Sequence, residues 1–191
     1  QDALASRANV MLIRSREVFT GRVTRMTVDT VELPNGHRTD LEVLHHPGGA
    51  AVVAVDGERR VCLLRQYRHA AGGYVVELPA GRLEPAEPPA RTAERELAEE
   101  AGMHAARWRE LGLSLSSPGV FTERIHLYLA TELTAVASAP EAAEVFEVQW
   151  VPLEEAVQRC LQGDIEDSKT CLGLLRAAAV LAPTERAESP C

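Results

Sequence analysis

The run Ala90–Ala101, ARTAERELAEEA, constrains the fold of this chain more than any other segment. It is built almost wholly from strong helix formers. Pro89 stands near its start, where the missing N–H of proline has no helical partner to lose. Gly102 follows its end, where a glycine in the left-handed conformation commonly closes a helix. We therefore predict an α-helix over these residues.

Short strand-like segments surround this helix. Ala50–Val55 and Arg60–Gln66 are predicted strands joined by the turn Asp56-Gly57, and Tyr74–Leu78 is a third that is closed by Pro79-Ala80-Gly81. Further strands are predicted at about 109–116, 125–132 and 144–151, and further helices over 153–162 and 168–181. Because strands and helices are mixed without regular alternation, an α+β fold is expected.

The N-terminal part has a different pattern. Residues 17–43 contain two or three short segments rich in Val, Thr and Met, and Pro34-Asn35-Gly36 is a strong turn signal between them. Such a strand appendage is too small to be stable alone, so it must pack on the main domain or on a partner subunit. We divide the chain into an appendage (1–45), a main domain (46–182) and a flexible tail (183–191).

The composition excludes several classes of protein. Apolar residues make up 46% and charged residues 25%, as in a soluble globular protein. The net charge of -8 argues against a broad surface for nucleic acid. An acidic protein that handles phosphates must do so locally, with a few arginines or with metal ions. The four cysteines form no CxxC pair, and neither a membrane span nor a secretion signal is visible. We expect a cytoplasmic protein that binds neither nucleic acid nor membrane.

The predicted helix carries an acidic patch. At 100° per residue its apolar arc, which we expect to pack against a sheet, is formed by Ala90, Ala93, Leu97 and Ala101. Glu96, Glu99 and Glu100 occupy a neighbouring arc, where like charges repel by roughly 0.2–0.5 kcal/mol per pair. Arg95 can pair with Glu99 but cannot neutralise three acids. A hard divalent cation is the natural counter-charge, and a solvated acidic face is the alternative.

The spacing around this patch is specific. Gly81-x5-Glu87-x7-Arg95-Glu96-Leu97-x-Glu99-Glu100-x-Gly102-Met103 resembles the Nudix box at every specified position. The resemblance implies the Nudix fold, a mixed sheet sandwiched between helices. It also implies that Mg2+ or Mn2+ is held by Glu96, Glu99, Glu100 and the carbonyl of Ala80. Glu87 then resembles the architectural glutamate of the box. Arg95 resembles the arginine that orients the acids, and the resemblance implies that Arg95 and Glu100 are among the catalytic residues.

Segments outside the box resemble the ADP-ribose pyrophosphatase branch of the family. RQYRHAAGGYVVELPAG has the form of the stretch before the box, and Arg68 within it is our candidate for a diphosphate contact. A surface ion pair is the alternative for Arg68. Ser117-Pro118-Gly119 resembles a further element of this branch, which implies that Gly119 approaches a ribose and that Glu123 accepts its hydroxyls.

The resemblance also suggests a general base and a dimer. In the family the base often lies in a loop before a strand that leads to a tryptophan, and EAAEVFEVQW has that form. Glu144 is the first candidate and Glu141 the second; a solvated loop glutamate is the alternative. The N-terminal strands resemble those that reach a partner subunit, and Glu42 falls near an adenine-contacting glutamate. Near Glu42, Asp40 stands where the family has an arginine, although Arg38 is close, and this departure leaves the base of the substrate open.

The predicted function is metal-dependent hydrolysis of a nucleoside diphosphate joined to another group, with ADP-ribose converted to AMP and ribose 5-phosphate. Hydrolysis of GDP-mannose or another nucleotide sugar is the first alternative, because the box does not read the leaving group. The second is a Nudix module that binds a nucleotide without cleaving it. Such a module is expected to lose metal-binding glutamates, whereas this chain retains them. The expected partners are the small-molecule substrate and a second copy of the chain.

Overall fold

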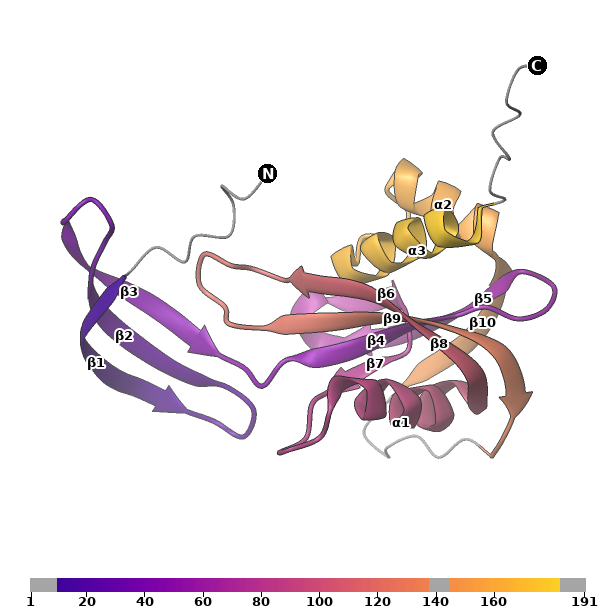
Figure 1. The fold of residues 1–191 in the computed structure, drawn as a ribbon, viewed down its shortest axis with the longest axis horizontal. Helices are drawn as coiled ribbons and strands as arrows, with labels where there is room; N and C mark the ends of the chain where they lie inside the picture. Colours follow the sequence, from indigo (N-terminus) through magenta and orange to yellow (C-terminus); the bar gives the residue numbers. More distant parts are fainter. Residues whose placement is uncertain (1–9, 138–144, 183–191) are drawn as a thin grey trace, which may run out of the picture. The chain divides into compact units, whose positions relative to one another are not determined.

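The computed structural model describes residues 10–137 and 145–182 and divides the chain into two compact units. The first unit comprises residues 1–48 with 115–124, and the second comprises 49–114 with 125–191 (Figure 1). Among the described residues, no helix is both long and apolar enough to cross a membrane.

The first unit is built on a three-stranded antiparallel sheet in the order β1-β2-β3. The strands are β1 (Met11–Thr20), β2 (Arg25–Glu32) and β3 (Arg38–His45). The predicted turn joins β2 to β3: Gly36 adopts a φ of 80°, and its N–H donates to the carbonyl of Leu33 at 2.8 Å. β1 begins at Met11, before the predicted start at Glu17, because pairing with β2 extends the strand.

A segment distant in sequence belongs to the same unit. The N–H of Leu44 at the end of β3 donates to the carbonyl of Val120 at 2.7 Å, and the N–H of Thr122 donates to the carbonyl of Leu44 at 2.9 Å. Residues 115–124, which connect two strands of the second unit, are therefore hydrogen bonded to the end of the N-terminal sheet.

The second unit contains two sheets. A four-stranded mixed sheet has the order β7-β4-β9-β8, and a three-stranded antiparallel sheet has the order β10-β5-β6. The first sheet consists of β4 (Gly49–Ala54), β7 (Ala80–Arg82), β8 (Met103–Leu115) and β9 (Arg124–Ala135). The second consists of β5 (Arg60–Arg68), β6 (Gly73–Glu77) and β10 (Phe146–Pro152), with the short 3-10 helix η1 (His69–Ala71) between β5 and β6.

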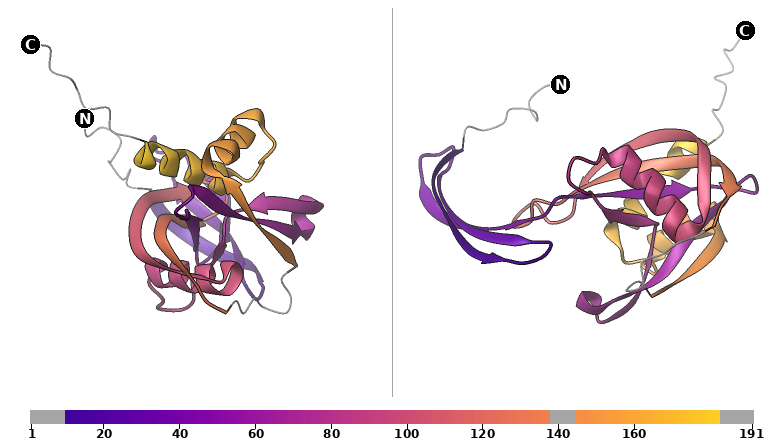
Figure 2. Two further views of the ribbon diagram at one scale, coloured as in Figure 1. Left: turned by 90° about the vertical axis from the view of Figure 1, so that its right-hand side faces the viewer. Right: turned by 90° about the horizontal axis from the view of Figure 1, so that it is seen from below.

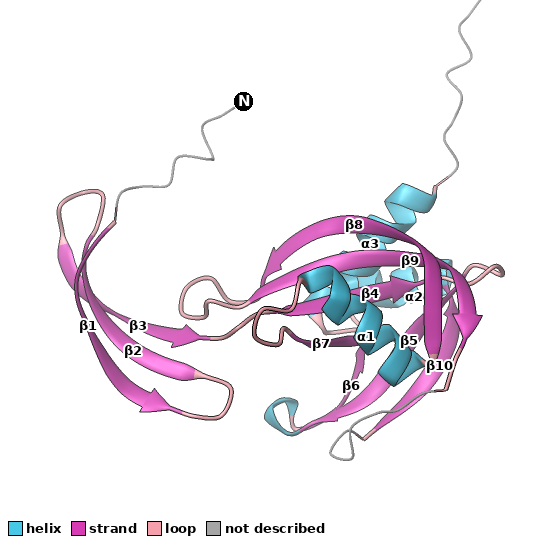
Figure 3. Ribbon diagram, turned by 60° about the horizontal axis from the view of Figure 1, so that its bottom comes forward, coloured by secondary structure: helices cyan, strands magenta, loops and turns pink. Residues whose placement is uncertain are grey.

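Helices cover the strands of this unit on two sides. Successive side chains of a strand point to opposite faces, and every residue of β4 is buried. Ala51 and Val53 belong to the cluster that includes residues of α2 (Leu153–Gln162) and α3 (Ser168–Leu181). Ala50, Val52 and Ala54 belong to the cluster of α1 (Pro89–Ala101). The view from below shows α1 in front of the strands with α3 behind them (Figure 2, right), and Figure 3 shows the same layers by element type.

The structure differs from the predicted elements in three places. The strands predicted at 50–55 and 60–66 form, and Val55 and Val61 make an antiparallel bridge next to the turn that joins them, but β4 and β5 belong to different sheets. Pro79-Ala80-Gly81 does not merely close a strand, since Ala80–Arg82 is itself the edge strand β7. The strand predicted from about residue 109 begins at Met103, directly after Gly102 ends α1 with a φ of 63°.

Candidate active site

Helix α1, which carries the glutamates of the box and is called the box helix below, buries carboxylates on the face that was expected to be apolar. Ala93 and Leu97 are fully buried, as predicted, but Ala90 is exposed. Glu96 is only 6% exposed and Glu100 only 2%, so two acids share the inner side of α1 with the apolar residues. Burying a carboxylate costs free energy unless it has compensating partners. The contacts of Glu96 and Glu100 therefore show how the site is built.

The main chain of β7 meets both buried acids. The N–H of Ala80 donates to Oε2 of Glu100 at 2.8 Å. At Gly81 a Cβ atom would lie 1.7 Å from Oε1 of Glu96, so only glycine allows this carboxylate to pack against the strand. The structure thus brings the predicted ligand Ala80 together with Glu100, and it gives a steric reason for the first glycine of the box.

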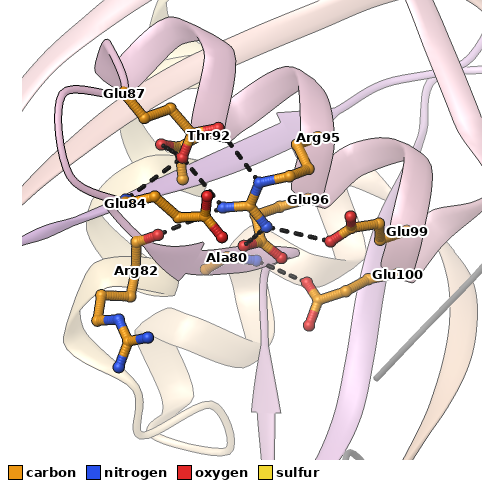
Figure 4. A network of polar contacts seen from close by, with 9 residues as sticks. All are labelled: Ala80, Arg82, Glu84, Glu87, Thr92, Arg95, Glu96, Glu99 and Glu100. Carbon is orange, nitrogen blue, oxygen red and sulfur yellow. Dashed lines mark hydrogen bonds and ion pairs between the residues drawn. The ribbon is translucent and has the colours of Figure 1, made fainter. Parts of the chain in front are cut away.

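Arg95 ties the remaining parts of the box together (Figure 4). Its Nη1 donates to Oε1 of Glu96 at 2.6 Å and to Oε2 of Glu99 at 3.1 Å. Its Nε and Nη2 donate to the two oxygens of Glu87, each at 3.2 Å, and Nη2 also reaches the carbonyl of Arg82 at 3.3 Å. The hydrogen bond to Glu87, followed by the charge of Glu96, raises the pKa of Arg95 against the opposing effect of burial.

Glu87 has the architectural contacts that the resemblance implies. It accepts a hydrogen bond from Thr92 Oγ1 at 2.7 Å and so links the loop before α1 to the first turn of the helix. The hydrogen bond from Arg95 is the main reason that the pKa of Glu87 is lowered. The side chain of Pro88 makes no capping hydrogen bond to α1, so the hydrogen bond between Thr92 and Glu87 is a side-chain link that holds this helix start.

The donor set fits a hard divalent cation. The main chain of Ala80 and the carboxylates of Glu96, Glu99 and Glu100 supply oxygen ligands only, which suits Mg2+ or Mn2+. These groups gather around one side of α1 and the adjoining strand β7 (Figure 4). Among the described residues, no group of three or more His, Cys, Asp or Glu side chains is arranged to hold a metal ion. Arg95 and the N–H of Ala80 engage the carboxylates in this arrangement.

Arg68 lies in the second unit and makes a well-defined ion pair. Its Nε and Nη2 donate to the two oxygens of Glu77 at 2.7 and 3.1 Å, while its side chain is 42% exposed. The hydrogen bond to Glu77 raises the pKa of Arg68. Arg68 therefore forms an ion pair, as the alternative interpretation proposed, but its partner is a buried acid rather than a surface one. Because part of the guanidinium is exposed, a contact with a diphosphate is still compatible with this arrangement.

The three other candidates for substrate contacts belong to the first unit. Glu42 is an exposed residue of β3. Gly119 is exposed, and a Cβ atom there would meet nothing within 4 Å among the described residues, so no steric contact of this part of the chain requires a glycine. Glu123 lies 3.3 Å from Nδ1 of His46, between a carboxylate oxygen and the ring nitrogen. The candidates for the base, Glu141 and Glu144, lie outside the described residues.

Sequence reasoning missed a buried polar group next to the site. Glu77, 3% exposed, ends β6 and is held by Arg68 and by Lys169 of α3. Asp167 caps α3 by accepting from the N–H of Thr170 at 3.0 Å. Two features of the sequence could have pointed to this group. Asp167 stands as an N-cap residue directly before the helical run, and Lys169 is the only lysine of the chain.

Comparisons with known proteins identify the family. The model of the NUDIX domain matches residues 45–170. A methanol dehydrogenase activator of Bacillus methanolicus is 38% identical over 164 residues, covering 85% of this chain and 89% of that protein. ADP-ribose pyrophosphatases of Bacillus subtilis (strain 168) and Mycobacterium tuberculosis are 37% and 39% identical, covering 85% and 88% of this chain and 89% and 83% of their own lengths.

A solved structure supports the fold. The crystal structure of an ADP compounds hydrolase superposes with a TM-score of 0.78 at 21% identity and covers 90% of this chain and 94% of its own. The chain belongs to the Nudix family. The predicted α+β Nudix fold and the predicted class of enzyme, a Nudix pyrophosphohydrolase, are confirmed. Hydrolases of this family generally depend on a divalent metal ion.

Proposed function

We propose that the chain hydrolyses ADP-ribose to AMP and ribose 5-phosphate with Mg2+ as the metal. The observation that carries this proposal is the packing of Glu96 and Glu100 against the main chain of Ala80 and Gly81. The ADP-ribose pyrophosphatases among the similar proteins support the choice of substrate. Mn2+ is the alternative metal, because it accepts the same oxygen ligands.

The residues of the box have distinct roles in this proposal. Glu96, Glu99, Glu100 and the carbonyl of Ala80 would hold the metal. When bound, the metal stabilises the negative charge that develops on the pyrophosphate oxygens. Arg95 fixes Glu96 and Glu99 relative to each other and to Glu87, which limits the rearrangement needed on binding. Pre-arranged charges of this kind act mainly on the rate rather than on substrate affinity.

Residues outside the box would position the substrate. We assign the diphosphate to Arg68, because Glu77 already orients its guanidinium through Nε and Nη2 and part of the side chain remains exposed. Glu42 would contact the adenine, and Gly119 and Glu123 the ribose. Glu144, or else Glu141, would take the proton from the attacking water. Replacing a pure base by Gln lowers the maximal rate with little change in metal affinity, and that titration distinguishes Glu144 from Glu96.

The side chains of the first unit near the expected adenine contact make GDP-mannose an alternative substrate. Asp40 accepts a hydrogen bond from Thr30 at 2.6 Å, and Arg38 pairs with Glu32 at 2.8 Å. These two side chains are thus engaged within the sheet at the place where the branch is expected to read an adenine. GDP-mannose is the natural competitor to test.

A substrate panel tests the proposed function. Purified protein with Mg2+ is given ADP-ribose or GDP-mannose, and release of AMP or GMP is measured by chromatography. We expect AMP from ADP-ribose at the higher kcat/KM. The same preparation carrying Glu100→Gln controls for contaminating hydrolases. Preferred release of GMP would show that GDP-mannose, not ADP-ribose, is the substrate. Equal rates in the parent and in Glu100→Gln would overturn the catalytic role assigned to the box.

A further inference from the structure

Lys169 is unusual in this sequence, because it is the only lysine in a chain that otherwise uses arginine as its permanent cation. It lies in the first turn of α3, and its side chain is only 14% exposed. Its Nζ is 2.5 Å from Oε2 of Glu77 and 3.0 Å from Oδ2 of Asp167. A compact ammonium with two carboxylate partners at this depth points to a structural task.

Glu77, the first of these partners, is fixed from two sides. Arg68 of β5 binds both of its oxygens, and Lys169 of α3 binds one of them. Burial alone would raise the pKa of Glu77, but the hydrogen bond from Arg68 and the charge and hydrogen bond of Lys169 outweigh it and lower the pKa. The last residue of β6 is therefore an anchored carboxylate directly before the segment 78–81.

Thr170 holds the next residue of the chain. Its Oγ1 accepts a hydrogen bond from the N–H of Leu78 at 2.9 Å and donates to Oδ2 of Asp167 at 2.6 Å. Leu78 lies between β6 of one sheet and β7 of the other, so its buried N–H depends on this side chain instead of a strand ladder. Gly173 lets α3 approach closely, since a Cβ atom there would lie 2.8 Å from Cδ1 of Leu78.

The other end of the same segment, Ala80 and Gly81, borders the candidate active site. The carbonyl of Pro79 accepts from the N–H of Val52 at 2.9 Å, and the N–H of Ala80 donates to Glu100. Gly81 then packs against Glu96. The main chain between Glu77 and Gly81 therefore contacts α3 at one end and the box helix at the other. The residues of α3 that it contacts lie about ninety positions further along the chain.

We propose that Asp167, Lys169 and Thr170 form a bracket that positions the Ala80–Gly81 main chain against Glu96 and Glu100. The three are positioning residues, because Lys169 and Thr170 contact Glu77 and Leu78, and Asp167 contacts Lys169 and Thr170. The inference rests on the proposed function for what Ala80 does when metal is bound. The contacts of the bracket, and their effect on the Ala80 amide, stand without it.

Three variants and one control test the bracket. Thr170→Val removes the hydroxyl at nearly constant volume, Thr170→Ser restores it, and Lys169→Met removes the ammonium. Arg176→Met is the control, because Arg176 is a cation of the same helix whose Nη1 donates instead to the carbonyls of Leu111 and Leu113 on β8. All are compared with the parent by hydrogen exchange of the Ala80 amide without metal, and by kcat, KM and the Mg2+ requirement.

We expect the Ala80 amide to exchange about tenfold faster in Thr170→Val and Lys169→Met, with parent-like exchange in Thr170→Ser. We expect kcat to fall about tenfold and the Mg2+ concentration for half-maximal rate to rise, while KM changes by no more than about threefold. Arg176→Met should lower stability without these changes. Parent-like Ala80 exchange in both bracket variants, or an equal loss of kcat in Arg176→Met, would overturn the proposal.

The two hypotheses fail in different ways. If the parent cleaves no member of the substrate panel, the proposed function fails, and the exchange of Ala80 in metal-free protein still decides on the bracket. If the parent is active and Thr170→Val matches it in both exchange and kcat, the bracket fails while the enzyme assignment stands. Should Lys169→Met not fold, Thr170→Val and Thr170→Ser carry the test alone.

Discussion

The two compact units use their apolar side chains in opposite ways. In the second unit every residue of β4 is buried, because helices cover the strand on both of its faces. In the first unit every residue of β1 is exposed, including Leu12 and Phe19, each at 58%. One unit has a core of its own, whereas the other presents a surface that costs free energy in water.

The difference bears on assembly. A three-stranded sheet whose edge strand is apolar and uncovered is open to pairing or packing with another chain. The predicted homodimer supplies such a cover, in line with the appendage inferred from the sequence, and it remains a prediction.

The largest effect is expected in the second unit, at the buried acid of the box. Glu100→Gln keeps the shape of the side chain but removes the charge that faces the Ala80 main chain. Turnover at saturating substrate and ordinary Mg2+ should fall by about 100-fold or more, equivalent to about 3 kcal/mol of barrier. Sedimentation should match that of the parent. A variant that retains most of its turnover would refute the role given to this glutamate.

Glu77 tests how far the second unit depends on its own buried charges. Replacing Glu77 by Gln leaves Arg68 and Lys169 facing a neutral group, and we expect a loss of about 2 kcal/mol in the free energy of unfolding near pH 7, allowing for the exposure of Arg68. Because folding lowers the pKa of Glu77, this stabilisation is complete above the ordinary glutamate value of 4.5 and is lost as the pH falls below it.

Urea unfolding of parent and variant at several pH values measures this dependence. The difference between them should be constant from about pH 6 to 8 and shrink below about pH 4.5. Glu154→Gln serves as the control, because Glu154 pairs with Arg59 at an exposed position and should matter little. A gap that persists unchanged in acid would show that the charge of Glu77 is not what stabilises the fold.

The smallest effect on turnover is expected from the first unit. Leu12→Ser combined with Phe19→Ser removes exposed apolar surface from β1, and the protein should sediment as a monomer if that surface is the dimer contact. KM should rise by several-fold, on the order of 1 kcal/mol, with thermal unfolding of the second unit nearly unchanged. Arg16→Ser, on the same strand, is the matched control. A double variant that stays dimeric would place the interface elsewhere.

The sequence by itself determined the helix and the chemistry on it. Helix propensity, Gly102 at the end of the helix and the 3.6-residue period act between residues close in the chain, so the acidic patch of Glu96, Glu99 and Glu100 follows from spacing alone. The link between Arg95 and Glu99 is likewise a local contact of neighbouring helical turns, and the structure contains it at 3.1 Å.

Only the tertiary structure decided which groups meet across the chain. The helical arc predicted Ala90 to be buried and did not predict that Glu96 and Glu100 lie inside, because burial is set by the strand that α1 packs against. β4 and β5 are neighbours in sequence but belong to different sheets. The contacts of Glu77 with Lys169 and of Leu78 with Thr170 join segments far apart in the chain, and no local pattern of propensity or spacing encodes such pairings.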